Sequence, residues 1–223
     1  MQRVSIFTSD MEAARFEDFA HGDTVFTFAL LTCEGPTQLV EGAAWAFVDW
    51  VLAECSGLEL VRRLRADERM RNARIVMVLE EDDEDDRRRA LKAGADDYAV
   101  APLGRQHMLD RVLAVQRVAM TAPDRLIEHG DLVINVGSEQ ARWQGKRIVL
   151  RPNEFRVLRF LAENPDRIFS REELIGALGK AGDPGYLRTV DVWIKRLRAG
   201  LRDGGAAHLL RTVHGKGYVF DRP

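Results

Sequence analysis

The sequence predicts two domains: an N-terminal α/β domain with a doubly wound parallel sheet of five strands, and a C-terminal α+β domain that ends in a helix and a β-hairpin. Three observations support this prediction. Apolar strands alternate with helical segments up to about residue 118, a pattern typical of a parallel sheet covered on both faces. A cationic amphipathic helix and a hairpin follow near the C-terminus. Residues 1–118 hold 15 Lys and Arg against 22 Asp and Glu, a net charge of −7, whereas residues 119–223 hold 18 against 13, a net charge of +5.

Length and composition narrow the class of protein. A chain of 223 residues suits two domains of about a hundred residues each. The basic C-terminal half favours binding to a polyanion. The two cysteines, Cys33 and Cys55, are too few for a disulfide scaffold or a zinc site, so we expect reduced thiols in a cytoplasmic protein, with a redox pair as the alternative. We expect no signal peptide and no membrane span, because no apolar run approaches about 18 residues.

The N-terminal elements follow from periodicity and from turn residues. Strands are predicted at 3–8, 24–32, 45–48, 75–79 and 98–100, and helices at 11–20, 57–65, 84–93 and 105–118. The carboxyl ends of parallel strands meet at one edge of a sheet, where ligands bind in such folds. We therefore expect Asp10, Asp49 and the residue after Val78 to converge there.

The C-terminal half predicts a small sheet at 126–135 and 141–150, with Gln144-Gly145 as a turn. One helix is expected from Pro152 to Glu163, since Pro suits the first helical position. Ser170 and Glu173 form a capping-box pattern that opens a second helix, which ends near 178. Gly204-Gly205 ends the third helix, and a hairpin is expected at 209–212 and 217–220.

The third helix has two unlike faces. Val190, Ile194, Leu197 and Leu201 fall within one narrow arc. The opposite face carries Arg188, Val192, Lys195 and Ala199, with Arg196 beside them. A buried apolar stripe with a cationic outer face is what a helix needs to enter a DNA major groove, although a solvated basic face would give the same pattern.

The segments RTVDVWIKRLRAGL and RTVHGKGY closely resemble the winged-helix DNA-binding domain of the OmpR/PhoB family of response regulators. The resemblance extends back to residue 126. It implies a winged-helix domain at 126–223, a linker at 119–125 and a receiver domain at 1–118. It also implies that the loop 179–186 can contact RNA polymerase.

The N-terminal half resembles a receiver domain. Asp49 matches the phosphoacceptor, with Gly57 eight residues on, and the GADDY signature ends at Tyr98. Pro102 stands where the family has a cis-proline. The family's Mg²⁺ is held by carboxylates, so Asp10 and Asp49 are the candidate ligands of a weak site.

Several positions depart from the family's switch. The resemblance places Ser9 at the first acid, Leu79 at the Thr or Ser, and Ala101 at the Lys, while Tyr98 keeps the aromatic position. Leu79 offers no hydroxyl and Ala101 no charge. The sequence therefore predicts a degenerate receiver that acts without phosphorylation and requires no cofactor. The alternative is a conventional regulator that a histidine kinase switches through Asp49.

Two further features concern charge. The acidic run 80–86 is followed by three arginines, which suits a helix N-terminus and i,i+4 pairing. The alternatives are that Glu80 replaces the charge of a phosphate, or that the run docks a partner. The resemblance also implies a homodimer through the family's fourth and fifth helices and the strand between them, in which Asp97 and Arg111 match one ion pair. The partner of Asp96 is less clear, since the family's basic residue falls at Val118.

The resemblance implies a set of DNA contacts. Phosphate and base contacts are expected from the recognition helix and from the wing, at Arg188, Thr189, Val192, Trp193, Lys195, Arg196, Arg198, Thr212, His214 and Lys216. Packing of Trp193 within the domain is the alternative at that position. We conclude that the sequence predicts a cytoplasmic, sequence-specific, dimeric DNA-binding regulator. A protein-interaction module is the rival from another class, and no catalytic residues are predicted, since phosphate loops and dinucleotide-binding turns are missing.

Overall fold

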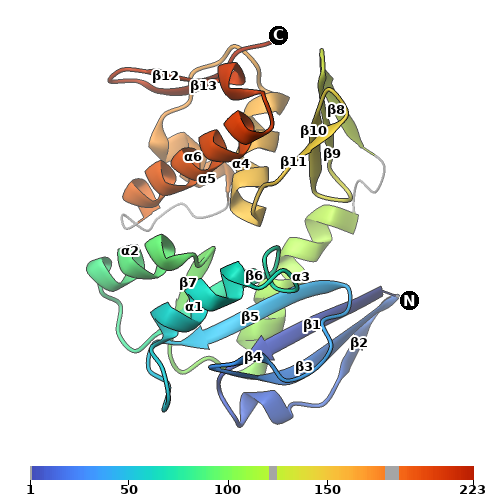
Figure 1. Cartoon of the computed structure of the whole chain (residues 1–223), viewed down its shortest axis with the longest axis vertical. Helices are drawn as coiled ribbons and strands as arrows, with labels where there is room; N and C mark the ends of the chain where they lie inside the picture. Colours follow the sequence, from blue (N-terminus) through green and yellow to red (C-terminus); the bar gives the residue numbers. More distant parts are fainter. Residues whose placement is uncertain (1, 121–124, 179–185) are drawn as a thin grey trace. The chain divides into compact units, whose positions relative to one another are not determined.

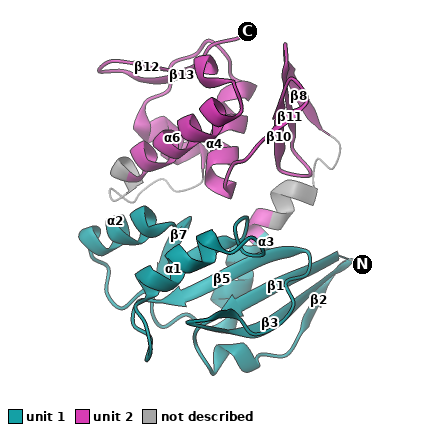
Figure 2. Cartoon of the chain, viewed as in Figure 1, with its two compact units in different colours: residues 1–113 teal, residues 114–223 magenta. Residues whose placement is uncertain are grey.

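The structure is a computed structural model that describes residues 2–120, 125–178 and 186–223. It divides into two compact units, Met1–Leu113 and Ala114–Pro223 (Figure 2). Residues 121–124 of the predicted linker lie outside the described residues. Each unit has its own core, and each is described separately below.

Unit 1 is built on a mostly parallel sheet (Figure 1). Its described strands are β1 (Gln2–Thr8), β2 (Phe19–His21), β3 (Thr24–Thr32), β4 (Gly35–Pro36), β5 (Ala43–Asp49), β6 (Arg74–Leu79) and β7 (Asp97–Val100). The strand order is β2-β3-β1-β5-β6-β7, with β4 paired to β3. The run β3-β1-β5-β6-β7 is parallel throughout, which confirms the five predicted strands. Every residue of β6 is buried, as expected for a central strand covered on both faces.

Three further predicted helices are confirmed: α1 (Gly57–Ala66) and α2 (Glu84–Ala93) in unit 1, and α3 (Arg105–Met120), which begins in unit 1 and ends in unit 2. Ser56 caps α1 and Asp83 caps α2, because each side chain accepts a hydrogen bond from a backbone N–H of the first turn. The acidic run behaves as a helix start. The arginines that follow pair back to its acids, as in Arg87–Asp82.

The predicted helix at 11–20 is wrong. The described chain there forms only a short 3₁₀ turn, Ala13–Arg15, and then β2, which pairs antiparallel with β3. Gly22 in the connecting turn has φ +57°, a left-handed conformation that suits a hairpin. Phe16 and Phe19 pack on the β3 residues Phe28 and Phe26, with ring centroids 5.5 and 5.9 Å apart. These aromatic contacts outweigh the helical periodicity of the segment.

The described part of unit 1 therefore contains fewer α-helices than the five of a complete (βα)5 fold. Among its described residues, the connections from β1 to β3 and from β3 to β5 carry no α-helix. The fold class is nevertheless the predicted one, with three α-helices packed on a mostly parallel sheet.

Unit 2 matches its prediction closely. Strands β8 (Leu126–His129), β9 (Leu132–Asn135), β10 (Gln140–Trp143) and β11 (Lys146–Ile148) form an antiparallel sheet in the order β11-β10-β9-β8. Helices α4 (Pro152–Glu163), α5 (Arg171–Ala177) and α6 (Tyr186–Asp203) follow, and β12 (Leu210–Val213) pairs with β13 (Gly217–Phe220). The predicted capping box at Ser170 and Glu173 is present.

The core of unit 2 lies where α6 meets α4 and α5. The predicted stripe of α6 is at most 1% exposed at Val190, Ile194, Leu197 and Leu201. The hairpin is attached to the chain before α5, because Phe169 and Tyr218 exchange two backbone hydrogen bonds of 2.9 Å. A Cβ on Gly217 would stand 2.0 Å from the carbonyl oxygen of Phe169, so only glycine fits at the base of β13. The hairpin is therefore held against the chain that leads into α5, the helix on which α6 packs.

Candidate phosphoacceptor site and nucleic-acid interface

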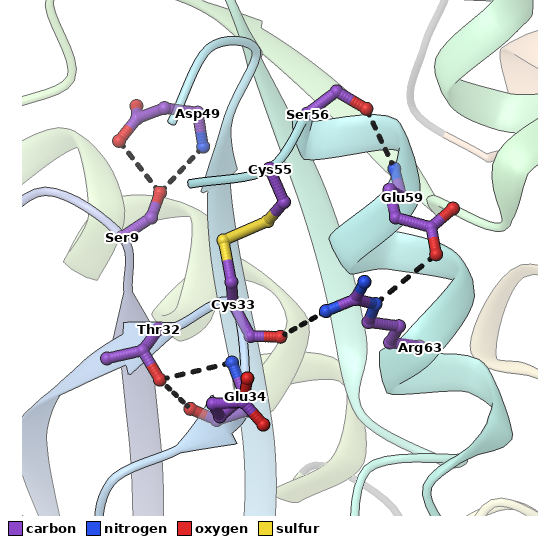
Figure 3. Close-up of a disulfide and its surroundings, with 10 residues drawn as sticks. Ser9, Thr32, Cys33, Glu34, Asp49, Cys55, Ser56, Glu59 and Arg63 are labelled. Atoms are coloured by element: carbon purple, nitrogen blue, oxygen red, sulfur yellow. Dashed lines mark hydrogen bonds and ion pairs between the residues drawn. A yellow bond between two sulfur atoms is a disulfide. The ribbon is translucent and has the colours of Figure 1, made fainter. Parts of the chain in front are cut away.

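Asp49 stands at the carboxyl end of β5, next to Ser9, the residue that follows β1. Ser9 and Asp49 are joined by two hydrogen bonds of 2.8 Å (Figure 3). In one, the Ser9 hydroxyl donates to Oδ2 of Asp49, and in the other the backbone N–H of Asp49 donates to the Ser9 hydroxyl oxygen. The structure thus brings the predicted positions together, with a serine hydroxyl bound to the carboxylate.

Asp10 takes a different position from the one expected of a metal ligand. Its Oδ1 accepts hydrogen bonds from the backbone N–H groups of Glu12, at 2.8 Å, and Ala13, at 3.3 Å. The negative charge of Asp10 still acts on Asp49. Burial raises the pKa of Asp49, the Ser9 hydrogen bond opposes that rise, and the negative charge of Asp10 adds to it.

The other switch positions surround the same strand ends. Leu79 at the end of β6 is 1% exposed, and Ala101 after β7 is exposed. The Ala101–Pro102 peptide bond is cis, as the resemblance implied. Tyr98 is buried, and the Arg87 guanidinium lies 5.1 Å from its ring centroid. The aromatic side chain therefore packs in the fold beneath a cation.

These residues differ from the set of acids that the resemblance implies for a magnesium site. Mg²⁺ needs several oxygen ligands in near-octahedral geometry. Here Ser9 stands in place of one acid and donates a hydrogen bond to the Asp49 carboxylate, while the Asp10 carboxylate accepts a hydrogen bond from the backbone of the following turn. Within the described ranges, no group of three or more His, Cys, Asp or Glu side chains is placed to hold a metal ion.

The prediction of two reduced thiols is wrong. Cys33 and Cys55 form a disulfide, with their Cα atoms 6.1 Å apart. Cys33 follows β3, and Cys55 lies in the loop between Asp49 and α1 (Figure 3). The sequence separation of 22 residues gave no signal, because the pairing depends on how β3 and β5 are placed in the sheet.

The two acids of the GADDY segment have different surroundings. Asp97 lies 3.4 Å from Arg111 on α3 of the same chain, in a partly exposed ion pair. Asp96 is 4% exposed and forms a 2.5 Å ion pair with Arg65 of α1. It also accepts a 2.9 Å hydrogen bond from the backbone N–H of Ile75. Asp96 is thus bound within its own unit, whereas side-chain placement at 116–120 lies outside the described part.

The solvent-facing side of α6 agrees with part of the predicted DNA interface. Lys195 is exposed and Val192 is partly exposed. The Arg188 side chain and the loop at 179–185, the predicted RNA polymerase contact, lie outside the described residues. The face of α6 opposite its buried stripe therefore carries at least one exposed cation, Lys195.

Three predicted contact residues are placed differently. Thr189 is 4% exposed and Trp193 is 1% exposed, so both side chains lie in the core, and packing is the correct alternative for Trp193. On the 3.6-residue period of the helix, Thr189 and Trp193 lie beside the apolar stripe, so their side chains point into the core. The Arg196 side chain is 18% exposed, and its Nε lies 4.0 Å from the carboxylate of Glu154 on α4.

The wing carries the remaining predicted contacts. Thr212, His214 and Lys216 are all exposed, and the last two stand at the turn between β12 and β13. Arg198 of α6 donates a hydrogen bond to the Thr212 hydroxyl, which ties helix and wing together. We call these residues, together with Lys195 of α6, the helix–wing face.

A network missed from the sequence braces this face. Tyr218 donates a 2.7 Å hydrogen bond from its hydroxyl to Asp191 of α6. Arg171 of α5 binds Asp191 at 2.8 Å and donates to the Tyr218 oxygen at 3.2 Å. Burial, followed by the bond to Asp191, raises the pKa of Tyr218. The only sequence signal was polar residues on three separate elements, which nothing local connects.

Comparison with known families assigns both units. Residues 41–113 match the response regulator receiver domain, and residues 145–220 match the C-terminal domain of transcriptional regulatory proteins. The receiver match begins at residue 41, just before β5, and so leaves out most of the two connections that would carry the first two α-helices of a complete (βα)5 fold. Within the described ranges, no helix has the length and apolar character of a membrane span.

Relatives match across both units. The phosphate regulon transcriptional regulatory protein PhoB of Escherichia coli K12 is 33% identical over 174 residues, covering 78% of this chain and 76% of the relative. The transcriptional regulatory protein BaeR of Escherichia coli O6:H1 is 35% identical over 207 residues, covering 91% and 80%. A solved structure of a RitR mutant has a TM-score of 0.63 over all of both chains at 17% identity, which supports the fold alone. The chain belongs to the OmpR/PhoB family of DNA-binding response regulators.

Proposed function

We propose that this protein regulates transcription by binding double-stranded DNA sequence-specifically through the helix–wing face. The observation that supports it most is the pairing of an amphipathic helix with a basic-tipped hairpin, joined by the Arg198–Thr212 and Tyr218–Asp191 hydrogen bonds. Helix α6 would lie in the major groove, and Lys195 and Lys216 would contact phosphates. A protein with this function would work in the cytoplasm.

We further propose that DNA binding does not depend on phosphorylation of Asp49, and that no cofactor is needed. The chemistry around Asp49 supports this. A phosphoryl group there would meet the negative charge of Asp10, while Leu79 offers no hydroxyl and Ala101 no cation. Without the family's hydroxyl and cation, a phosphoryl group on Asp49 would lack the contacts that couple phosphorylation to a rearrangement.

Dimerisation through α2, β7 and α3 is the arrangement we propose for binding paired half-sites. Strand β7 ends the described sheet order, and its last residue, Val100, is 40% exposed. Apolar surface there and on α3 would supply most of the affinity, because exposed ion pairs such as Asp97–Arg111 contribute little. Sedimentation velocity tests this: Val100→Asp should lower the dimer fraction, whereas Leu39→Asp, at another exposed apolar residue, should not.

Selection of bound sequences from a genomic DNA library tests the function. Unphosphorylated wild-type protein should retain a defined set of sites, and Asp49→Ala should retain the same set with the same affinity. Lys195→Ala should weaken binding to all of them, whereas Arg62→Ala, an exposed cation on α1 of the other unit, serves as the matched control.

The outcomes separate the alternatives. Binding that requires a phosphodonor, and that Asp49→Ala abolishes, would establish a conventional kinase-switched regulator. Retention of no DNA by wild-type protein in either state would refute the DNA-binding proposal itself.

A further inference from the structure

The Cys33–Cys55 disulfide joins two segments of the receiver that secondary structure does not join. Cys33 lies in the turn between β3 and β4, and Cys55 lies in the loop that leads from Asp49 to α1 (Figure 3). The Cys33 carbonyl accepts a 3.1 Å hydrogen bond from Arg63 of α1, so a second contact joins the same two regions. The closed loop of chain contains β5 and Asp49.

The loop between Asp49 and α1 is closely tied to the Asp49 backbone. The N–H of Gly57 donates a 3.0 Å hydrogen bond to the Trp50 carbonyl, and Val51 pairs with Ser56 in an isolated bridge. A Cβ on Gly57 would stand 2.1 Å from the Asp49 carbonyl oxygen. Cys55 therefore lies two residues from a glycine that is packed against the Asp49 backbone.

The disulfide is placed where a small thiol can reach it. Cys33 is 6% exposed, whereas Cys55 is only partly covered by its surroundings. Attack is therefore expected at the sulfur of Cys55. Disulfides in a compartment that holds thiol reductants are usually transient or sensory. This step rests on the proposed function, because a DNA-binding regulator would work in such a compartment.

We propose that Cys33 and Cys55 are a reversible redox site whose disulfide holds the Asp49–Gly57 loop in place and whose reduction releases it. In the reducing direction, a thiolate of the glutathione class attacks Sγ of Cys55, the disulfide bond breaks, and Cys33 leaves as a thiolate that takes up a proton. A second small thiolate then attacks the mixed disulfide at the small-molecule sulfur. Cys55 is released and protonated, and one glutathione disulfide is formed. Oxidation by glutathione disulfide is the reverse.

The site supplies the receiver with an input that does not use phosphate. The disulfide closes a loop with 22 residues of separation and reduces the entropy of the unfolded receiver. Reduction should therefore lower the melting temperature of unit 1 by about 10 °C. It should also increase amide hydrogen exchange in the segment 50–57, while the hairpin of unit 2 stays unchanged.

The test uses the purified full-length chain without DNA, so its outcome is independent of whether the protein binds DNA. The protein is equilibrated in glutathione buffers of varied reduced-to-oxidised ratio, free thiols are alkylated, and mass spectrometry gives the oxidised fraction. Hydrogen exchange of segment 50–57 is measured on the same samples. Cys33→Ser and Cys55→Ser should match the reduced protein, and neither should respond to the buffer.

The expected result is a two-electron titration, in which the exchange of segment 50–57 follows the oxidised fraction. A pair that stays oxidised, or stays reduced, across all buffer ratios would overturn the reversible site. Full titration with unchanged exchange at 50–57 would overturn the coupling to the Asp49 loop. If the serine variants fail to fold, wild-type protein alkylated in the reduced state supplies the same comparison.

Discussion

Asp96 offers the sharpest test of the structure, because family resemblance and tertiary structure give it different roles. The resemblance raises the question of a partner across a dimer interface. The structure instead buries it beneath α1, where the Arg65 side chain is 6% exposed and that of Asp96 is 5% exposed. Arg65 also donates to the carbonyl oxygens of Gly94, Arg71 and Ala73 at 2.7–3.1 Å. This cluster connects α1, β6 and the turn before β7.

Asp96→Asn keeps the shape of the side chain but removes its charge. The Arg65 guanidinium then stays buried without a counterion, and breaking such a pair costs about 3–5 kcal/mol. For a unit of this size that lowers the melting temperature by about 10–20 °C. Asp97→Asn is the matched control, since the Asp97 and Arg111 side chains are 23% and 39% exposed and exposed pairs contribute about 0–1 kcal/mol.

Differential scanning calorimetry of the full chain, with the unit 2 transition as internal reference, measures both variants. Arg65→Met combined with Asp96→Asn should cost less than the sum of the single changes, because the pair variant leaves no unpaired buried charge. A shift for Asp96→Asn no larger than that of Asp97→Asn would refute the buried-pair argument. If Asp96→Asn instead lowered only the dimer fraction in sedimentation, its role would be intermolecular.

Three further predictions concern the two sites. Because the pKa of Asp49 is raised above 3.8 in the folded protein, the protonated carboxyl favours folding, and that contribution is lost as pH rises through the folded pKa. Asp49→Asn should therefore stabilise unit 1 at pH 7 but not below the unfolded pKa, as melting curves over pH would show; equal gains at both pH values would contradict this. Tyr218→Phe removes the hydroxyl that binds Asp191 and should cost about 0.5–1.5 kcal/mol in urea unfolding of unit 2, with weaker DNA binding; wild-type affinity would show that the network does not position the wing. Lys195→Ala should lower the slope of log affinity against log salt by about one, as fluorescence anisotropy measures, and an unchanged slope would exclude a phosphate contact.

Much of the fold was predictable because its signals are local. The apolar runs of β5 and β6 and the cap at Ser170 are determined by residues a few positions apart, and the structure confirms them. The same holds for the buried stripe of α6, since a helix repeats its faces every 3.6 residues. The substitutions at Ser9, Leu79 and Ala101 were also visible in the sequence, because the resemblance to the receiver family assigns a switch role to each of those positions.

Tertiary structure decided the features that depend on distant contacts. The segment 11–20 has a helical pattern, but Phe16 and Phe19 find better partners on β3 and the chain turns at Gly22. The Cys33–Cys55 disulfide requires β3 and β5 to lie on either side of β1, an arrangement that no local pattern specifies. Burial of Trp193 and Asp96 likewise depends on what packs over them. The fold class therefore follows from local sequence patterns, and the chemistry lost from the switch follows from the resemblance to the receiver family. Which of those side chains face solvent depends on the packed structure, because exposure is a property of neighbours brought from elsewhere in the chain.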